Sequence, residues 1–583
     1  MSDARRDNPL LRLAAVTAGR PWPLAMEGLL LAFLAAFLIA PIALAVGRGF
    51  VEADRWTLYW LWRAVSDAAT QSQFLDGLLI ASATTCASMV LALGPALLRA
   101  RCRFPGRGAL GLLLLVPMIL PPFVGALAMK HLFSRFGALN LLLSRLGVLD
   151  FSRSLPPDWL GSGLAGVVLL QSLHLFPILY LNASAALANV DPAYAQAARN
   201  LGAGAVRTFF RITLPLIRPG LFAGGTIVFI WSLTDVGTPL ILGYEHVVPV
   251  TVFKGLAKSD VSPRVYSLVF VMFSGAATLY VLGKFLFGRS ISAVSAKASV
   301  AAETRRLGVA GTLGAWLVFG AIIAAALLPH AGVVLTAVSR RWVNTVLPDD
   351  YTLRHLSFVL TQPATYNSIL NSLRYSGLST AADIAMGCLA AWLIVRARVP
   401  GRTLLDGLTM LPLAVPGVIM AAGYVAMTAP GTWLESIGPM GSHPAVILVV
   451  AYAVRRLPFV VRGVSAGLEQ VPETLEEAAR NLGASRTGAT FRITAPLIAA
   501  NIIAAGVLTF AFAVLEVSDS LILAQTRPMY PITKQIYTLA ASGNYDAVNV
   551  ASALGVYGML LLGGTMALAS ALLGKRLGAI FRA

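Results

Sequence analysis

Long apolar runs at regular spacing are the feature that most restricts the fold of this 583-residue chain. A helix needs about 20 mostly apolar residues to cross a bilayer. Six runs of this length precede residue 290, and six more follow the polar, Ala/Ser-rich stretch 289–308. We therefore expect an all-α polytopic membrane protein. Its twelve predicted spans are 24–46, 75–98, 109–131, 162–184, 221–243, 266–288, 309–336, 370–395, 404–427, 444–466, 501–524 and 547–573.

The composition agrees with membrane insertion and argues against a nucleic-acid partner. Hydrophobic residues make up 57% of the chain and charged residues only 12%, whereas a soluble domain carries about 25% charge. The net charge of +19 would suit nucleic acid if the basic residues formed a domain. Instead, the arginines lie in short loops between apolar runs, where cationic residues fix the orientation of a membrane protein. The expected partner of the surface is therefore a lipid bilayer, with no nucleic acid.

The basic loops predict which ends of the spans face the cytoplasm. Lys and Arg are concentrated before the first span, after the second, after the eighth and at the end of the chain, in the stretches 1–20, 99–107, 396–402 and 575–582. With twelve spans, all four stretches fall on one side of the membrane. Because short cytoplasmic loops carry an excess of Lys and Arg, we expect both termini to be cytoplasmic.

Sequence patterns for catalysis are missing. The pattern GxxxxGK[ST], which cradles nucleotide phosphates, does not occur, and neither does HExxH. The match to GxSxG at 463–467, GVSAG, lies at the end of a predicted span and not at the strand-to-helix turn that this motif requires. The three cysteines show no spacing typical of a zinc site or of a disulfide framework. We therefore expect a chain that is not an enzyme and that binds no cofactor of its own.

One polar, helix-sized stretch occurs twice. Residues 195–217 read AQAARNLGAGAVRTFFRITLPLI, and residues 476–498 read EEAARNLGASRTGATFRITAPLI, at a constant offset of 281. A second pair, 104–122 and 399–417, aligns at an offset of 295 and shares a Pro-Gly-Arg loop. Since each half has an even number of spans, the halves have the same orientation and form parallel repeats. The expected organisation is a six-span half at 1–288 with a cytoplasmic loop at 187–220, a cytoplasmic linker at 289–308, and a six-span half at 309–583 with a cytoplasmic loop at 467–500.

Both copies of the repeated stretch carry signals for a short helix. In the first copy Asp191 can cap a helix that has Pro192 at its first position, and in the second Thr474 and Glu477 have capping-box spacing. Each helix is expected to stop at the glycine of AARNLGA, where a left-handed residue costs little. The paired alanines should leave a face that another protein can approach closely. The candidate contact residues are Gln196, Ala197, Ala198, Arg199 and Gly202 in the first copy, and Glu477, Ala478, Ala479, Arg480 and Gly483 in the second.

The repeated stretch resembles a motif of a known family. A loop helix that packs only under its own bundle would explain one copy, whereas two matched copies favour contact with another protein. The second copy reads EAA, three further residues, Gly, and then Phe-x-Ile-x-x-Pro. This pattern resembles the cytoplasmic loop of permease subunits in binding-protein-dependent ABC importers. The first copy departs from it at Gln196, which replaces the Glu, and matches at the later Gly, Phe, Ile and Pro.

The resemblance implies a type I ABC importer permease in a bacterial inner membrane. In that family the loop helix docks in a groove of a cytoplasmic ATPase and passes its movement to the spans. A homodimeric ATPase has two equivalent grooves, so a fused permease needs two docking helices. The resemblance also implies that the ATPase subunits use the ATP, and that a periplasmic substrate-binding protein delivers the cargo.

The cargo is predicted less directly than the family. A single chain with both halves resembles permeases for ferric iron, 2-aminoethylphosphonate and thiamine. Three stretches favour ferric iron: TDVGTPLILG at 234–243, YAVRRLPFVVR at 452–462 and EVSDSLILA at 516–524. Import of 2-aminoethylphosphonate, thiamine or a polyamine stays open. A secondary transporter driven by an ion gradient is the alternative from another class, although it does not explain the repeated helix.

Charged residues within the predicted spans are candidates for the translocation pathway or its gate. Such residues are costly in a bilayer and usually face a cavity or a partner. Asp235 and Glu516 correspond at offset 281, and so do His174 and Arg455, whereas Asp519 has no charged counterpart. The two carboxylates could receive a hard cation such as Fe³⁺, or they could pair with His174 and Arg455. A buried ion pair that only orients the spans is the alternative interpretation. Kinks in spans three and nine are expected at Pro117, Pro121, Pro412 and Pro416.

Overall fold

A computed structural model describes residues 21–52, 55–152, 155–160, 163–258, 261–287 and 305–573. Helices dominate these residues, because apolar helix formers such as Leu and Ala fill the long runs and because a helix satisfies its backbone polar groups internally. This confirms the expected all-α fold. The predicted linker lies outside the described residues, apart from its last part, 305–308.

The chain folds into two compact units. Unit 1 contains the described parts of 1–48, 367–531 and 561–583, and unit 2 contains those of 49–366 and 532–560. These units differ from the two halves of the sequence. The first helical segment of the chain belongs to unit 1 with most of the second half, whereas the first span of the second half belongs to unit 2 with most of the first half.

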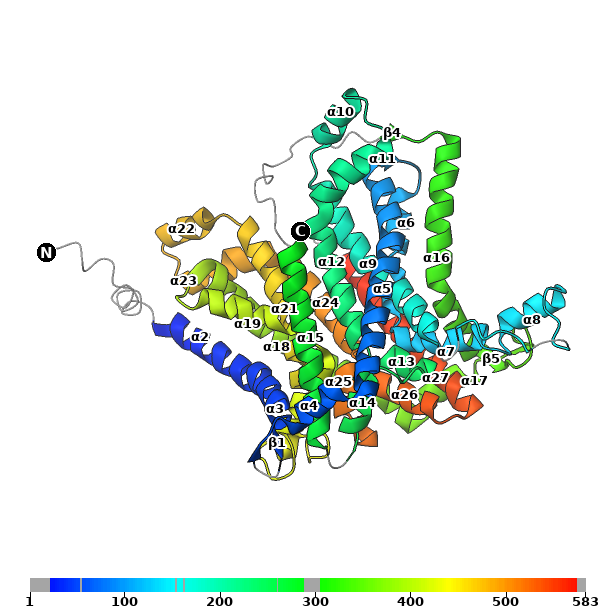
Figure 1. Cartoon of the computed structure of the whole chain (residues 1–583). Coiled ribbons are helices and arrows are strands. Elements are labelled where there is room, and N and C mark those ends of the chain that lie inside the picture. The colour runs from blue at the N-terminus through cyan, green and yellow to red at the C-terminus, as the bar shows by residue number, and fades with distance from the viewer. Residues whose placement is uncertain are drawn as a thin grey trace. The chain divides into compact units, whose positions relative to one another are not determined.

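Unit 2 is built around three long helices. Its helices are α4 (Tyr59–Ser66), α5 (Ala68–Arg101), α6 (Arg107–Leu113), η2 (Val116–Ile119), α7 (Pro122–Phe133), α8 (Ala138–Arg145), α9 (Leu164–Ala188), α10 (Pro192–Asn200), α11 (Ala205–Thr208), η3 (Phe209–Thr213), α12 (Leu214–Thr234), α13 (Gly237–Leu242), α14 (Val248–Leu256), α15 (Pro263–Phe287), α16 (Val309–Val338), α17 (Arg354–Thr361), α26 (Ile532–Ala541) and the first part of α27 (Tyr545–Leu573). The helices α5, α9 and α12 lie side by side (Figure 1). Phe176, Tyr180 and Phe319 are fully buried in the apolar core that these three helices form with α16.

Three short strand pairs accompany the helices of unit 2. The pairs β1 (Val51–Glu52) with β2 (Arg55–Trp56) and β5 (Ser339–Arg341) with β6 (Asp350–Tyr351) are antiparallel, and the pair β3 (Cys102–Arg103) with β4 (Arg305–Arg306) is parallel. Each strand has only two or three residues, so these pairs close loops and do not form a sheet layer.

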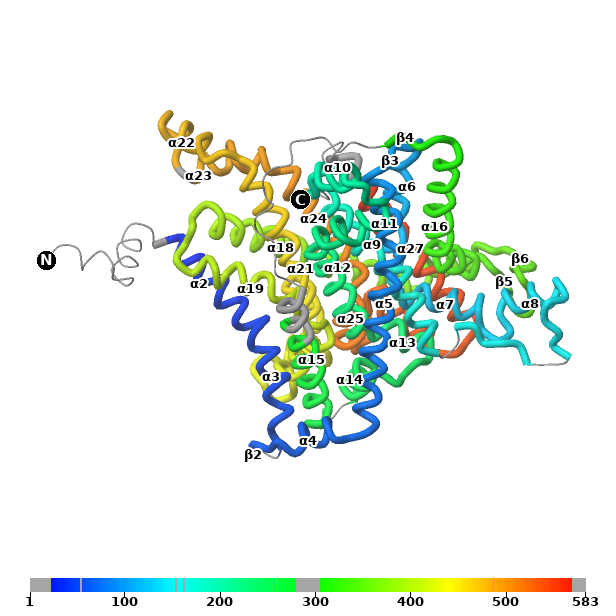
Figure 2. The backbone as a smooth tube through the Cα atoms, turned by 45° about the horizontal axis from the view of Figure 1, so that its top comes forward, coloured from blue at the N-terminus to red at the C-terminus, as the bar shows by residue number. Residues whose placement is uncertain are grey.

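Unit 1 contains most of the second half. Its helices are α2 (Pro21–Leu34), η1 (Ala35–Ile39), α3 (Ala40–Arg48), most of α18 (Pro363–Trp392), η4 (Leu393–Ala397), α19 (Arg402–Ala414), α20 (Gly417–Met427), η5 (Glu435–Ile437), α21 (Pro444–Gln470), α22 (Glu473–Asn481), α23 (Arg486–Ala489), η6 (Thr490–Thr494), α24 (Ala495–Val514), α25 (Ser518–Leu523) and η7 (Arg527–Met529). The helices α21 and α24 pack together. The short helices α22 and α23 connect them at one end (Figure 2).

The helices agree with the predicted spans in position, and nearly in number. Among the described residues, nine helices are long and apolar enough to cross a membrane, or eleven if each of two bent pairs is one span. The bent pairs are predicted spans three and nine. The remaining prediction, 266–288, falls on α15, which is a 25-residue helix. The chain is therefore a polytopic, all-α membrane protein.

The first helix of each half packs with the sequence of the other half. In unit 1, α3 lies against α20, so closely that a Cβ on Gly423 would be 2.3 Å from the carbonyl oxygen of Pro41. In unit 2, α16 lies against α7, where a Cβ on Gly332 would be 2.7 Å from the Cβ of Ala128. Small residues allow such close approach of helices in a membrane. The boundary between the repeats and the boundary between the units therefore differ.

Candidate functional site

The two helices for which docking is predicted, α10 and α22, are called the docking helices here, and they begin in different ways. Asp191 accepts a hydrogen bond from the N–H of Ala193 at 2.8 Å and caps α10, which confirms the prediction for the first copy. In the second copy α22 follows Pro472, whose backbone is extended and which makes no side-chain capping bond. The predicted capping box of Thr474 and Glu477 is therefore wrong. Thr474 already lies inside the first turn of the helix.

The docking helices end in the same way. Gly202 and Gly483 have φ of +78° and +92°, the left-handed conformation that favours glycine. In α10 the N–H of Gly202 donates to the carbonyl of Arg199 at 2.9 Å, and the N–H of Ala203 donates to the carbonyl of Ala198, also at 2.9 Å. The corresponding bonds of α22 are both 3.0 Å. This pair of bonds is the Schellman motif, and it confirms that both helices stop at these glycines.

Large apolar side chains are exposed at three matched positions of the docking segments. A polar loop that keeps exposed apolar groups in both copies marks an interaction surface. The sequence prediction concentrated on the alanines and did not name these residues, although an apolar residue at the same place in both copies was a usable signal. They are Tyr194 (46% exposed), Leu201 (88%) and Phe210 (60%) in the first copy, and Leu475 (43%), Leu482 (91%) and Phe491 (74%) in the second.

The predicted contact residues lie on more than one face of the docking helices. Ala198 and Ala479 are buried against their own units. The paired alanines therefore do not form one open face, as the sequence suggested, because consecutive helical residues point about 100° apart. Gln196 is partly buried. The exposed members are Ala197, Arg199 and Gly202 in the first copy, and Glu477, Ala478, Arg480 and Gly483 in the second.

Spans three and nine are broken at Pro121 and Pro416, two of the four prolines where kinks were predicted, whereas Pro117 and Pro412 lie within η2 and α19. The two parts of span three meet at 91°, and the two parts of span nine, α19 and α20, meet at 105°. In span three the break falls at Pro121 and Pro122, which have no N–H to continue a helix. In span nine it falls at Val415 and Pro416. Irregular backbone at membrane depth is tolerated only where protein buries it or where it lines a cavity.

His174 supports the break in span three. Its Nδ1 lies 3.0 Å from the carbonyl oxygen of Pro117. In a continuous helix this oxygen would accept the N–H of residue 121, but that residue is a proline. A buried carbonyl without a donor is costly. His174, which comes from α9, therefore supplies the donor that the break removes.

Arg455 occupies the equivalent place in the other half. It lies against Gly417, the first residue after the break in span nine. A Cβ on Gly417 would be 1.7 Å from an Nη atom of Arg455, so only glycine fits this position without displacing the guanidinium. His174 and Arg455 correspond at offset 281. In each half, a basic side chain from the following span is thus placed against a broken helix.

The two matched carboxylates also lie at helix breaks. The helix α12 ends at Thr234, and Asp235 accepts the N–H of Gly237 at 3.0 Å before α13 begins. Glu516 follows the end of α24 and accepts backbone N–H groups at the start of α25. The predicted spans 221–243 and 501–524 are therefore interrupted at the carboxylates. Free N–H groups at the start of each short helix provide donors for them.

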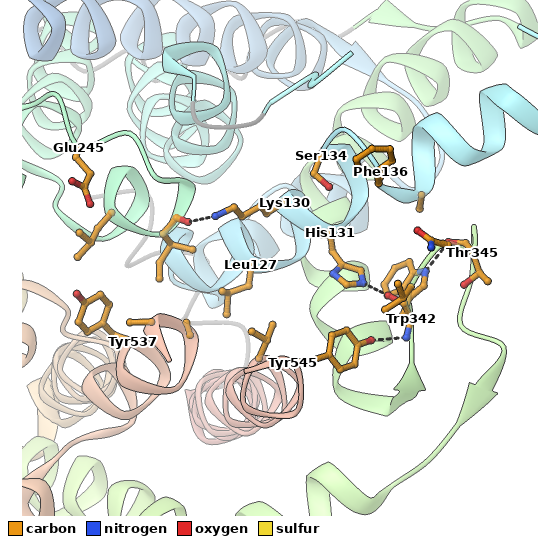
Figure 3. Close-up of a pocket in the computed structure, with 18 of the residues that line it drawn as sticks. Leu127, Lys130, His131, Ser134, Phe136, Glu245, Trp342, Thr345, Tyr537 and Tyr545 are labelled. Carbon is orange, nitrogen blue, oxygen red and sulfur yellow. Dashed lines mark hydrogen bonds between the residues drawn. The ribbon is translucent and has the colours of Figure 1, made fainter. Parts of the chain in front are cut away.

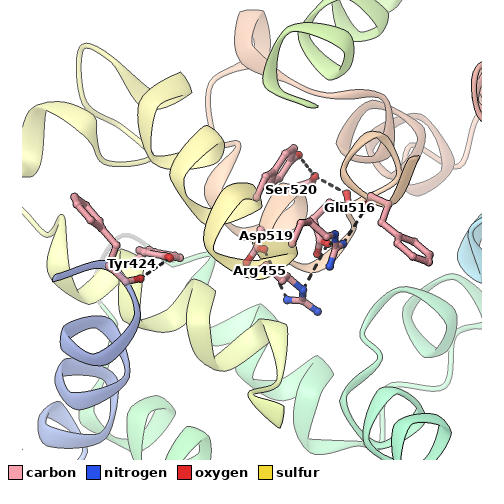
Figure 4. Close-up of polar contacts among 9 residues, drawn as sticks. Tyr424, Arg455, Glu516, Asp519 and Ser520 are labelled. Carbon is pink, nitrogen blue, oxygen red and sulfur yellow. Dashed lines mark hydrogen bonds and ion pairs between the residues drawn. The ribbon is translucent and has the colours of Figure 1, made fainter. Parts of the chain in front are cut away.

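In the second half of the chain, four charged residues lie together at these breaks. We call them the charged cluster: Arg455, Arg456, Glu516 and Asp519. The Nε of Arg455 lies 3.6 Å from Glu516, and one of its Nη atoms lies 3.7 Å from Asp519 (Figure 4). Arg456 also pairs with Glu516. The two carboxylates are almost fully buried, with 4% and 1% of their side chains exposed. Charges taken so far from water need this mutual compensation.

The first half does not form the equivalent ion pair. The second oxygen of Asp235 accepts a hydrogen bond from the amide of Gln171 at 3.0 Å, and His174 is bound to Pro117. Among the described residues no ion pair joins Asp235 to His174. The sequence suggested that each carboxylate could pair with the basic residue of its own half. This is confirmed for Glu516 with Arg455. It is wrong for Asp235 with His174, because His174 donates to the carbonyl of Pro117 at the helix break.

Asp383 extends the cluster in a way that the sequence did not indicate. It lies on α18, is fully buried, and interacts electrostatically with Arg456. Neither of its carboxylate oxygens has a hydrogen-bond partner among the described residues. Within those residues, no three His, Cys, Asp or Glu side chains come together as a metal site.

A cavity of about 660 Å³ lies within unit 2, separate from its docking helix. Segments from α7, α13, α26, α27 and the residues after β5 line it (Figure 3). Trp342 orders one wall, because its carbonyl lies 2.7 Å from Nε2 of His131 and its N–H donates to the hydroxyl of Tyr545 at 2.5 Å. Lys130 donates to the carbonyl of Ile241 at 3.4 Å. The volume falls in the range of small-molecule sites.

Comparison with known proteins assigns this duplicated, broken-span architecture to a family. The binding-protein-dependent transport system inner membrane component matches residues 88–297 and again residues 383–581. The chain belongs to this family. Because the match occurs twice, the chain is a fused, two-half permease subunit of an ABC importer and an inner membrane protein with several spans. It is a transport subunit.

Individual relatives differ in cargo. A Haemophilus influenzae protein named as ferric transport system permease FbpB 1 is 27% identical over 84% of this chain and 76% of its own length. The ferric transport system permease FbpB of Actinobacillus pleuropneumoniae is 27% identical over 79% of this chain and 65% of its own length. The molybdenum transport system permease ModB of Escherichia coli K12 is 34% identical over 31% of this chain and 82% of its own length.

Proposed function

We propose that this permease moves ferric iron from a periplasmic binding protein into the cytoplasm, driven by ATP hydrolysis in a separate ATPase homodimer. The observation that carries the proposal is the pair of docking helices, with the same Schellman ends and the same three exposed apolar positions. Two matched surfaces suit a partner that presents the same groove twice. Both termini and both docking helices are cytoplasmic in this proposal.

The exposed apolar side chains supply the contact with the ATPase, and the glycine ends keep each helix short. Leu201 and Leu482 are the most exposed of the matched residues, at 88% and 91%. Burying such side chains contributes roughly 1.5–3 kcal/mol each. Glu477, Arg199 and Arg480 add charge at the edge of the contact, where charge favours specificity and association rate.

Transport follows from coupling between two conformations. ATP closes the ATPase dimer, the docking helices move with it, and the two halves rock so that the pathway opens to the periplasm. Hydrolysis returns it to the cytoplasmic side. The ligands can shift this equilibrium only by their different affinities for the two states. The proposed pathway or gate residues are Asp235, Glu516, His174, Arg455 and Asp519.

The charged cluster acts as a gate in this mechanism and not as an iron site. Arg455 and Arg456 already compensate Glu516 and Asp519, so little negative charge is left for a trivalent cation. Broken helices next to the cluster provide backbone that can rearrange. Selection of the cargo then lies with the binding protein.

Relatives support iron over the other cargoes. The two relatives named for ferric transport align with both halves of the chain, whereas the molybdenum permease aligns with about a third of it. The test also includes 2-aminoethylphosphonate, thiamine and a polyamine, because the sequence left these cargoes open.

The test is transport in proteoliposomes that contain the permease, the ATPase and the binding protein encoded beside it. Fe³⁺, 2-aminoethylphosphonate, thiamine and a polyamine are supplied in turn, with and without ATP. We expect ATP-dependent uptake of Fe³⁺ and loss of that uptake in Gly483→Pro, because proline cannot adopt a positive φ. Uptake of another cargo would correct the substrate. Uptake that follows a proton or sodium gradient without any bound ATPase would favour a secondary transporter instead.

A further inference from the structure

Arg396 connects the docking helix of the second half to the spans. It lies in η4, at the end of span eight, and only 7% of its side chain is exposed. One Nη atom donates to the carbonyl of Leu468 at 2.8 Å and to that of Val471 at 2.5 Å. These carbonyls lie at the end of α21, where helix carbonyls lack some of their backbone donors; that of Leu468 also accepts the N–H of Val471 at 3.2 Å. Arg396 therefore joins spans eight and ten.

The same guanidinium holds the start of α22. Its other Nη atom lies 3.3 Å from Glu473, and its Nε lies 3.6 Å from Glu476. Glu476 in turn accepts a hydrogen bond from the buried hydroxyl of Thr494 at 2.5 Å. Thr494 lies in η6, just before span eleven. One arginine and one glutamate thus join the docking helix to three spans.

The first half has the arginine but not the acids. Arg101 corresponds to Arg396 at offset 295 and donates to the hydroxyl of Thr213, the counterpart of Thr494, at 2.5 Å. Pro192 and Ala195 occupy the positions of Glu473 and Glu476. Asp191, the capping residue of α10, takes part in no ion pair among the described residues. Those residues therefore show no ion pair that joins α10 to the spans as Glu473 and Glu476 join α22.

We infer that Arg396 is a positioning residue that transmits the movement of the ATPase to the second half, and that the two halves are coupled unequally. A planar guanidinium that donates to two carbonyls and forms ion pairs with two carboxylates moves little relative to them. The helix α22 and spans eight, ten and eleven consequently move as one body, whereas α10 has no carboxylates to form the same connection with Arg101. This inference rests on the proposed ATPase partner.

The experiment measures cargo transported per ATP hydrolysed in the reconstituted importer. Arg396→Met should lower this ratio by about 5- to 100-fold, the range of typical coupling between sites, while ATP hydrolysis continues. Arg101→Met is the matched variant of the first half and should change the ratio by less than about twofold. Arg398→Met removes an exposed pair with Glu473 and should also change it by less than about twofold, because surface pairs contribute little.

A second variant separates transmission from a merely structural role. Glu473→Gln with Glu476→Gln removes both carboxylates and leaves the bonds of Arg396 to the end of α21. We expect it to uncouple transport as Arg396→Met does. If Arg396→Met uncouples transport and the double variant does not, Arg396 only supports α21 and the inference is wrong. The inference is also wrong if neither change alters the ratio.

A gain-of-function variant tests the asymmetry directly. Ala195→Glu gives α10 a carboxylate at the position of Glu476, opposite Arg101. We expect it to raise the ratio in the Arg396→Met background, and no rise would contradict the inference that α10 lacks such a connection. Co-purification of the ATPase is recorded for every variant. If the parent binds no ATPase, the proposed function fails as well. If all variants bind it and remain coupled, only the inference fails.

Discussion

Replacing Gly417 with alanine should disrupt the charged cluster through its neighbour. The added Cβ would lie 1.7 Å from an Nη atom of Arg455 and 2.5 Å from its Cζ, so the guanidinium must move. Asp519 then loses its ion pair, while Glu516 keeps Arg456. Removing one partner of a buried pair costs about 3–5 kcal/mol. We expect the free energy of unfolding to fall by about 3 kcal/mol, the lower end of this range, because the pair of Glu516 with Arg456 survives.

Thermal unfolding of the purified permease measures this loss. In a unit of roughly 200 residues, about 3 kcal/mol lowers Tm by roughly 6–12 °C. The control is Gly407→Ala in the same broken span, where the added Cβ meets no atom within 4 Å and alanine favours the helix by up to about 1 kcal/mol. Arg455→His, which copies the residue of the first half, should restore part of the Tm of Gly417→Ala. Equal Tm values for the two alanine variants would refute the reasoning.

Three further predictions concern single residues. His174→Phe should lower the free energy of unfolding by about 1–3 kcal/mol, because the carbonyl of Pro117 loses its donor; a Tm equal to that of the parent protein would contradict this. Gly483→Ala places a side chain at φ +92°, which costs roughly 1–2 kcal/mol, and should weaken binding of the ATPase in a co-purification titration. Burial lowers the pKa of Lys534 to about 8 from 10.5, so the unfolded chain binds more protons between these values and stability should rise with pH across that window. In Lys534→Met the rise of Tm from pH 8 to 10.5 should disappear, and a flat profile in the parent would show that the lysine is not buried as described.

Local signals in the sequence were sufficient for the ends of both docking helices, for the start of the first one and for the positions of the spans. The glycine of AARNLGA marks the end of each docking helix, and Asp191 marks the start of the first, because caps depend on neighbouring residues. The offset of 281 also brought together Asp235 with Glu516 and His174 with Arg455 as matched pairs. These predictions needed no knowledge of how the helices pack.

The parts that the sequence did not indicate depend on contacts between distant segments. Arg396 looked like one more basic residue of a cytoplasmic loop, and only the packing of η4 against α21 and α22 shows its two carbonyl and two carboxylate partners. His174 looked like a partner for Asp235, yet it donates a hydrogen bond to the carbonyl of Pro117 at the proline break in span three. Interruptions at the two carboxylates were hidden because the apolar runs continue through them. For Arg396 and His174 the deciding partner lies more than 50 positions away in the sequence.

The exchange of first helices has a consequence for biogenesis. The helix α3 ends at Arg48, whereas α20, against which it packs, begins at Gly417, so about 370 residues must be made before the contact can form. At about 5–20 residues per second, the nascent α2 and α3 wait in the bilayer for roughly 20–70 s without their neighbour. A chain cut between its halves would resemble a swapped dimer, in which neither fragment completes its core alone. Covalent fusion keeps the missing neighbour at high effective concentration, and so sets both the stoichiometry of the two halves and the order in which they mature.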